Sequence, residues 1–228
     1  MTTFVIVHGA WAGAWAWVRV GDRLTAQGHR VVVPTLSGLG ERSHLAGPQI
    51  GFETHVADIV NEIRWKDLQD VVLVAHSYGG FVATAAVEEV GDRLAAIVYV
   101  DAFIPKDGQA FADFSPDWQV PADRLIDAPP AVLGDYLDDA DRIWVNAKAT
   151  PQPAGTFTGR VRVTGAYERV PRKAFVQATG WDGAIGGSLS EFEGRADWSV
   201  HRIACGHDVA IDKPDDLVAI LETFDGSV

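Results

Sequence analysis

The sequence is long enough for one domain with a sizeable core, and it is strongly acidic. It has 228 residues, of which 47% are hydrophobic and 22% charged, and its formal net charge at pH 7 is −12. That charge argues against nucleic acid as a partner and against an anionic membrane surface, because both need a basic face. The single cysteine excludes an intrachain disulfide framework and a zinc site built on several thiolates, so we expect a cytoplasmic protein.

The N-terminal stretch MTTFVIVHGAW lacks the basic region and the small-residue cleavage site of a secretion signal. No apolar run reaches the roughly 20 residues that a membrane-spanning helix requires. We therefore expect neither an exported protein nor a membrane protein.

Short apolar runs alternate along the chain with longer segments of helical periodicity. The predicted strands are 3–7, 30–34, 71–75, 95–100, 160–164 and the stretch around 198–203. Helices are predicted near 14–27, 53–65, 80–90, 173–178 and 215–224. This alternation predicts an α/β protein with a mostly parallel, doubly wound sheet.

Residues 105–159 interrupt that alternation with many prolines and with the large aromatic residues Trp118, Tyr136 and Trp144. A structureless loop of this length is rare in a compact domain, so we expect a small cap inserted between two strands of the sheet. The predicted organisation is a single domain whose core comprises residues 1–104 and 160–228, with the cap at 105–159.

The segment VVLVAHSYGGF runs from a buried strand through a serine turn into a helix. This is the layout of a nucleophile elbow, which exposes a serine hydroxyl at the carboxyl edge of a sheet. Ala75 stands where the usual motif has glycine. We predict Ser77 as the nucleophile; the alternative is a serine that only caps the helix.

A base for this serine is expected after the last strand of the sheet. The segment CGHDVAIDKP places His207 just beyond the predicted strand at 198–203 and before the final helix. The neighbouring His76 would point away from the Ser77 hydroxyl, so we interpret it as structural. His207 is the predicted general base.

Together, VHGAW, AHSYGG and GHDVAIDKP resemble the α/β-hydrolase superfamily. They are most similar to the branch that contains plant methyl esterases, salicylate-binding esterases, hydroxynitrile lyases and many bacterial carboxylesterases. The resemblance implies the α/β-hydrolase fold and an oxyanion hole formed by the backbone N–H groups of Ala10 and Tyr78. It also implies that Trp11 flanks the substrate pocket. We also assign Phe103 and Trp118 to this pocket, because they are aromatic and lie in or next to the predicted cap. An aromatic cage is not expected, because a cage needs a cationic guest and several converging rings.

Two carboxylates compete as the third member of a triad. Asp101 ends the strand predicted at 95–100, a position that resembles the one used by some dehalogenases and related esterases. Glu168 follows the strand predicted at 160–164, where most of the superfamily has its acid. We favour Asp101, because a carboxylate between apolar residues must find a partner, whereas Glu168 could form only a surface salt bridge.

The expected reaction is hydrolysis of small carboxylic esters through an acyl-enzyme, as in carboxylesterases. No metal or organic cofactor is expected, because neither a ligand cluster nor a phosphate-binding glycine loop is present.

Plant hydroxynitrile lyases commonly have threonine and lysine where this chain has Gly9 and Asp208, so cyanohydrin cleavage is the weaker alternative. A small-molecule binding protein with residual turnover is a second alternative. The expected partner is an ester substrate, and a homodimer is compatible with the sequence but not required by it.

Overall fold

A six-stranded parallel sheet forms the centre of the protein in the computed structural model, which describes residues 1–181, 183 and 189–226. The sheet order is β2-β1-β3-β4-β7-β8, and every neighbouring pair is parallel. The α/β-hydrolase fold predicted from the sequence is confirmed. The strands are β1 (Thr3–Val7), β2 (Arg30–Val32), β3 (Val71–His76), β4 (Leu94–Val100), β7 (Arg172–Ala178) and β8 (Trp198–Ile203).

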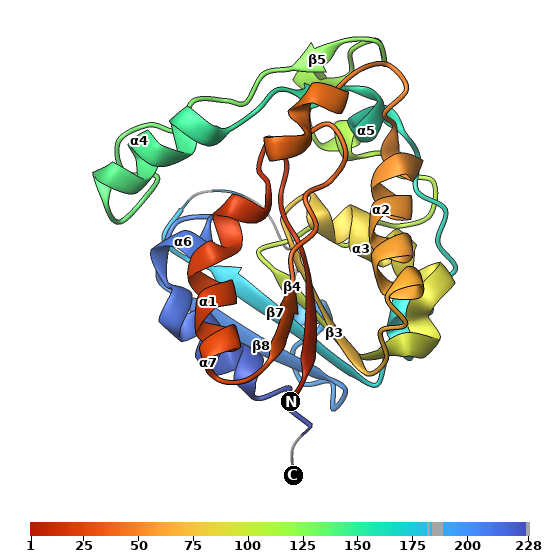
Figure 1. Cartoon of the computed structure of the whole chain (residues 1–228), viewed down its shortest axis with the longest axis vertical. Coiled ribbons are helices and arrows are strands. Elements are labelled where there is room, and N and C mark those ends of the chain that lie inside the picture. The colour runs from red at the N-terminus through yellow and green to blue at the C-terminus, as the bar shows by residue number, and fades with distance from the viewer. Residues whose placement is uncertain (182, 184–188, 227–228) are drawn as a thin grey trace.

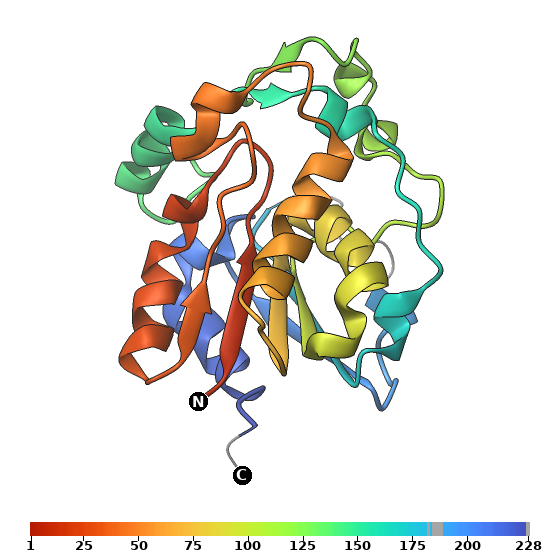
Figure 2. The same cartoon turned by 45° about the vertical axis from the view of Figure 1, so that its right-hand side comes forward.

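Helices cover both faces of this sheet (Figures 1 and 2). One face carries α1 (Val18–Ala26), α6 (Val209–Asp212) and α7 (Pro214–Glu222), and the other carries α2 (Phe52–Trp65) and α3 (Gly79–Val90). Because successive strand residues point to opposite faces, a strand covered on both sides is apolar throughout. All six residues of β3 are buried for this reason. None of the described helices is both long and apolar enough to cross a lipid bilayer.

The chain leaves the sheet after β4 and builds a cap above the carboxyl ends of the strands (Figure 1). The cap contains a two-stranded antiparallel ribbon and two helices, of which α4 projects from the body of the molecule. These elements are β5 (Leu125–Ile126), α4 (Asp139–Lys148), β6 (Gln152–Pro153) and α5 (Gly155–Thr158).

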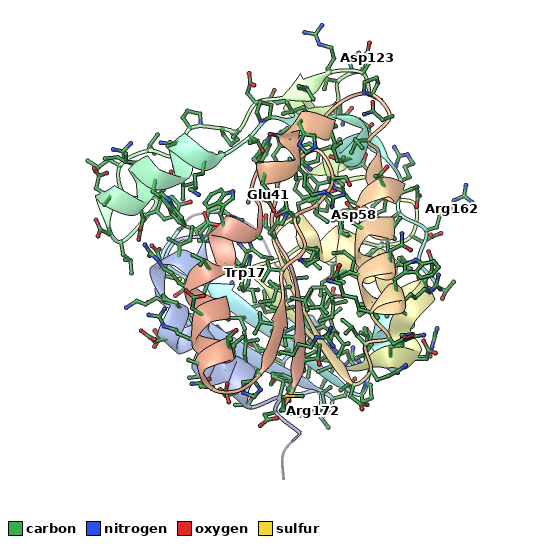
Figure 3. The ribbon with its side chains drawn as sticks, in the orientation of Figure 1. Trp17, Glu41, Asp58, Asp123, Arg162 and Arg172 are labelled. Carbon is green, nitrogen blue, oxygen red and sulfur yellow. The ribbon has the colours of Figure 1, made fainter. Side chains whose placement is uncertain are left out.

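The predicted strand at 160–164 was wrong. Arg160 forms one isolated bridge with Ala110, and residues 161–164 form no strand. Val161 is fully buried between exposed arginines, and Arg162 points outward at the edge of the molecule (Figure 3). An extended segment that lies on the core shows the same alternation as a strand. The sheet therefore resumes only at Arg172, and the segment outside the sheet spans 101–171.

The predicted helix at 173–178 is strand β7. Its start is marked by Lys173, whose side chain is almost fully buried. The ammonium donates to the carbonyls of Glu168 and Val170, at 3.0 and 2.7 Å, and pairs with Asp197. These partners allow a charged lysine to lie inside the fold. Because a buried strand is usually apolar throughout, the lysine at its start made β7 hard to recognise as a strand from the sequence.

Candidate active site

The turn between β3 and α3 presents Ser77 to a cavity. Ser77 has a φ of +52°, as the sharp strand-to-helix turn requires. A Cβ on Gly79 would lie 2.5 Å from the Val7 carbonyl oxygen and 2.6 Å from that of His8. Because Gly79 has no side chain, the start of α3 can pass close to the end of β1. This packing fixes Ser77 at the carboxyl edge of the sheet.

His207 lies in the loop between β8 and α6, and its Nδ1 is 2.7 Å from Oδ2 of Asp101. Asp101 follows β4 and is 1% exposed. Its carboxylate also accepts hydrogen bonds from the Ala178 amide at 3.2 Å and from the Trp181 indole at 2.9 Å. Because a carboxylate only accepts, the proton of a neutral His207 resides on Nδ1, and Nε2 is left as the basic nitrogen.

Two rings hold the His207 imidazole in this orientation. The His76 ring lies 4.5 Å from it between centroids, and the Trp181 ring lies 4.6 Å from it. His76 Nε2 is also 3.1 Å from the His207 carbonyl oxygen. His76 thus supports the predicted base from behind, in keeping with its interpretation as a structural residue.

Glu168 lies at the opposite edge of the sheet, so the structure contradicts it as the partner of His207. It precedes β7, and its carboxylate forms a two-pronged contact with Arg195, at 2.6 and 3.2 Å, near the start of β8. The hydrogen bonds from Arg195 lower the pKa of Glu168. The seven residues of β7, about 20 Å of chain, separate this ion pair from the carboxyl edge. The misplaced strand at 160–164 had put Glu168 at the wrong end.

The backbone around Ala10 is anchored from inside the core by His8. The His8 ring accepts a hydrogen bond from the Leu36 amide through Nε2, at 3.0 Å, and donates through Nδ1 to the Gly9 carbonyl at 2.8 Å. The Gly9 carbonyl and the Ala10 N–H belong to one planar peptide and point in opposite directions. Holding the carbonyl toward His8 therefore aims the Ala10 N–H the other way.

The next peptide is anchored from the cap. The Trp11 amide donates to Oε1 of Gln152 at 2.8 Å, and the Gln152 amide nitrogen donates to the Thr156 hydroxyl at 2.8 Å. Gln152 and Thr156 are both fully buried. The Trp11 indole also donates to the Ile126 carbonyl at 3.0 Å. Gln152 could not be found from the sequence, because a lone glutamine carries no pattern that would reveal this contact.

The Ala10 and Tyr78 amides have no hydrogen-bond acceptor among the described residues. Tyr78 is itself held in the core by His55, whose Nδ1 is 2.9 Å from the phenol oxygen and whose Nε2 is 2.8 Å from the Ser37 carbonyl. His55 is fully buried on the inner side of α2. Within the described structure, the backbone N–H groups of Ala10 and Tyr78 therefore remain available to donate to a ligand.

Three residues with positive φ surround this edge: Trp11 at +57°, Ser77 at +52° and Asp101 at +40°. The left-handed region is unfavourable for residues with a side chain, at roughly 1–3 kcal/mol each. Such residues concentrate where the surrounding structure holds a functional geometry in place. All three follow strands of the sheet, and all belong to the predicted site.

One cavity of about 350 Å³ joins these elements. Ser77, His207, Ala10 and Trp11 all line it. The described residues hold no group of three histidine, cysteine, aspartate or glutamate side chains arranged to bind a metal ion.

The structure does not place two predicted pocket residues, Phe103 and Trp118, on the wall of this cavity. Both turn into an aromatic cluster around Phe111: the Trp118 ring stacks on it at 4.8 Å, and the Phe103 ring meets it edge-on at 5.1 Å. Burial of these rings against one another takes them away from Ser77. Their contribution is to the packing of the cap on the core.

Burial lowers the pKa of three histidines to about 4, so they are neutral at pH 7. The cause is chiefly desolvation of the charged imidazolium. The three are His8, His55 and His76. Each therefore acts near the site as a neutral hydrogen-bonding group.

Comparison with known proteins places the chain in a family. Residues 4–220 match the family model described as the alpha/beta hydrolase family. The chain belongs to the alpha/beta hydrolase family. This hydrolase is 34% identical to a carbendazim hydrolyzing esterase of Nocardioides sp. (strain SG-4G), over 95% of this chain and 97% of that protein.

Two further relatives extend the comparison. The hydrolase is 35% identical to methylesterase 2 of Arabidopsis thaliana over 45% of this chain, a match that spans 40% of the plant protein. An extracellular alpha/beta-hydrolase from a Paenibacillus species, described as sharing structural and functional homology with tobacco salicylic acid binding protein 2, superposes with a TM-score of 0.83. That pair is 25% identical and covers 98% of each chain. The predicted branch is confirmed, and the hydrolase belongs with the esterases of the family.

Proposed function

We propose that this hydrolase cleaves small carboxylic esters through an acyl-enzyme on Ser77. His207 is the general base, and Asp101 orients it and stabilises its charged form. The observation that carries the proposal is the 2.7 Å contact of the His207 ring with a buried carboxylate, in the same cavity as the elbow serine.

In the acylation step, His207 Nε2 accepts the Ser77 proton while Oγ attacks the ester carbonyl carbon. The carbonyl electron pair moves to oxygen, and the Ala10 and Tyr78 amides donate hydrogen bonds to the resulting oxyanion. Each such donor contributes about 3 kcal/mol to stabilising the transition state. The intermediate then expels the alcohol, which takes the proton back from His207, and Ser77 remains acylated.

In the second half of the reaction, water attacks the acyl group as His207 removes its proton, and the acid leaves as Ser77 regains its hydrogen. The imidazolium that forms in each half lies against the negative Asp101. The Ala178 and Trp181 hydrogen bonds hold this carboxylate in place.

We expect the hydrolase to act in the cytoplasm, since its one cysteine forms no intrachain disulfide.

The test is nitrophenol release from p-nitrophenyl acetate and butyrate by the wild type and by Ser77→Ala. Ser43→Ala, which alters an exposed serine outside the cavity, is the matched control. We expect multiple turnover in the wild type and the control and its loss in Ser77→Ala. Carbendazim is a further substrate to include, given the 34% identity to an esterase named for it.

Labelling with a fluorophosphonate supplies a second readout, because it reports an activated serine without turnover. Mass spectrometry should locate the label on Ser77. Equal rates in wild type and Ser77→Ala, or a wild type that is neither labelled nor active on any of these substrates, would refute the proposal and favour the binding-protein alternative.

A further inference from the structure

The cavity that contains Ser77 has an acidic and aromatic wall. Two carboxylates, Asp135 and Asp208, line it, and no lysine or arginine is among its described lining residues. Four aromatic residues also line the cavity: Trp11, Trp15, Tyr136 and Trp181. Faces of such rings attract cations, and a neighbouring carboxylate adds a direct charge interaction.

Asp208 has no cationic partner within the described structure. One carboxylate oxygen accepts a hydrogen bond from the Tyr136 hydroxyl. The other is 3.8 Å from His76 Nε2. Burial, with the nearby His207, lowers the pKa of His76 to about 4, so this ring carries no charge at pH 7. About a quarter of the Asp208 side chain is exposed, and the negative charge therefore faces the cavity uncompensated.

The second carboxylate, Asp135, interacts electrostatically with the Arg142 guanidinium without forming an ion pair. Oδ2 of Asp135 accepts from the Val132 amide at 2.7 Å, and no ion pair involves Asp135 in the described residues. Lys148 is exposed on α4, with its ammonium 5.8 Å from the Trp15 ring centroid, but it does not line the cavity. Among the described lining residues, no lysine or arginine pairs with either carboxylate.

We propose that the cavity selects esters that carry a cationic group, either a protonated amine or a quaternary ammonium, with Asp208 as the counter-ion and the aromatic rings around it. The inference rests on the proposed function for the reaction that such an ester undergoes. The sequence predicted no aromatic cage for a cation, and this inference reverses that prediction. Residues far apart in the chain supply the additional rings and the carboxylates, which the N-terminal tryptophans alone could not provide. The net charge of −12 would also raise the local concentration of cationic substrates.

The experiment compares two esters that differ only in charge. Butyrylcholine carries a quaternary nitrogen where 3,3-dimethylbutyl butyrate carries a carbon. Their kcat/KM ratio is independent of the amount of active protein, so partial misfolding of a variant does not affect it. The variant is Asp208→Asn, which keeps an acceptor for Tyr136, and the control is Asp123→Asn, which removes the same charge on the outside of the cap (Figure 3).

We expect the wild type to favour the choline ester by about tenfold or more, as a carboxylate and rings together would give. Asp208→Asn should lower the ratio by about tenfold, whereas the control should change it less than twofold. Binding of choline and of 3,3-dimethylbutanol, followed by tryptophan fluorescence, tests the same preference without turnover.

A wild-type ratio of one or below, together with equal binding of choline and the neutral alcohol, would overturn the inference. An unchanged ratio in Asp208→Asn would overturn the role of that carboxylate. Persistent hydrolysis of both esters by Ser77→Ala would instead refute the proposed function, and the binding preference would then decide this inference alone.

Discussion

Replacing Gln152 by leucine should impair catalysis from a position in the cap. The change removes the acceptor of the Trp11 amide and the donor to the Thr156 hydroxyl. Two hydrogen bonds contribute about 1–3 kcal/mol, and a partly buried Trp11 N–H without a partner adds about 1 kcal/mol or more. We expect the free energy of unfolding to fall by about 2–4 kcal/mol.

The catalytic effect follows from what that hydrogen bond holds in place. Trp11 has a φ of +57°, and its peptide adjoins the Ala10 amide. If the backbone relaxes, the Ala10 N–H no longer points at the oxyanion. Complete loss of one such donor lowers kcat by about 10²–10³-fold, so partial displacement should lower it by about 10–100-fold. KM should change much less, because the donor acts on charge that develops in the transition state.

Thr156→Val is the matched control. It removes the partner of the Gln152 amide nitrogen but leaves the acceptor of the Trp11 N–H intact. Because it also removes the hydrogen bond from the Thr156 hydroxyl to the Pro153 carbonyl, it should lower stability by about 2–4 kcal/mol, like Gln152→Leu, and leave kcat within about threefold. Circular dichroism establishes a temperature at which both variants are folded, and fluorophosphonate titration gives the active fraction. A Gln152→Leu protein with the kcat of Thr156→Val would refute the reasoning.

Three further changes test other parts of the structure. Asp101→Asn should lower kcat by about 10³–10⁴-fold in the nitrophenyl ester assay while Glu168→Gln leaves it near wild type, and the reverse result would exchange their roles. Gly79→Ala should lower the free energy of unfolding by at least about 3 kcal/mol in urea titrations, because the new Cβ would lie 2.5 Å from a backbone oxygen; wild-type stability would contradict the close packing. Each neutral buried histidine binds a proton more readily once unfolded, so the free energy of unfolding should fall by about 1.4 kcal/mol per pH unit per histidine as the pH drops from 6.5 toward 4. Urea midpoints that stay constant between pH 6.5 and 4.5 would contradict the pKa values near 4 of His8, His55 and His76.

The residues at the carboxyl edge of the sheet could be predicted well from the sequence, because each belongs to a short, contiguous motif. The elbow around Ser77 and the loop of His207 each follow a recognisable strand, and both residues line the cavity. Asp101 could also be located, since a carboxylate directly after a buried strand has few places to lie. The structure brings it to His207.

Long-range contacts could not be predicted in this way. Lys173 is satisfied by carbonyls of a preceding turn and by Asp197, so its burial left no local signature, and β7 was assigned as a helix. Together with the strand wrongly predicted at 160–164, that error moved Glu168 to the wrong edge of the sheet. Gln152 and Trp181 act through single contacts with residues more than 75 positions away, at 141 and 80 positions respectively. Only the folded chain shows such pairs.

The positive-φ residues at the carboxyl edge of the sheet create a trade-off between thermal stability and catalytic activity. Trp11, Ser77 and Asp101 together hold roughly 3–9 kcal/mol of backbone strain, which is comparable to the 5–15 kcal/mol net stability of a typical domain. Glycine would adopt the same angles without that strain, and at Ser77 it would remove a side chain whose hydroxyl makes no hydrogen bond within the described structure, so selection for heat resistance alone should favour glycine there. The same substitution would remove the proposed nucleophile. Directed evolution of this protein for industrial temperatures should therefore recover robust but inactive variants unless activity is screened in parallel.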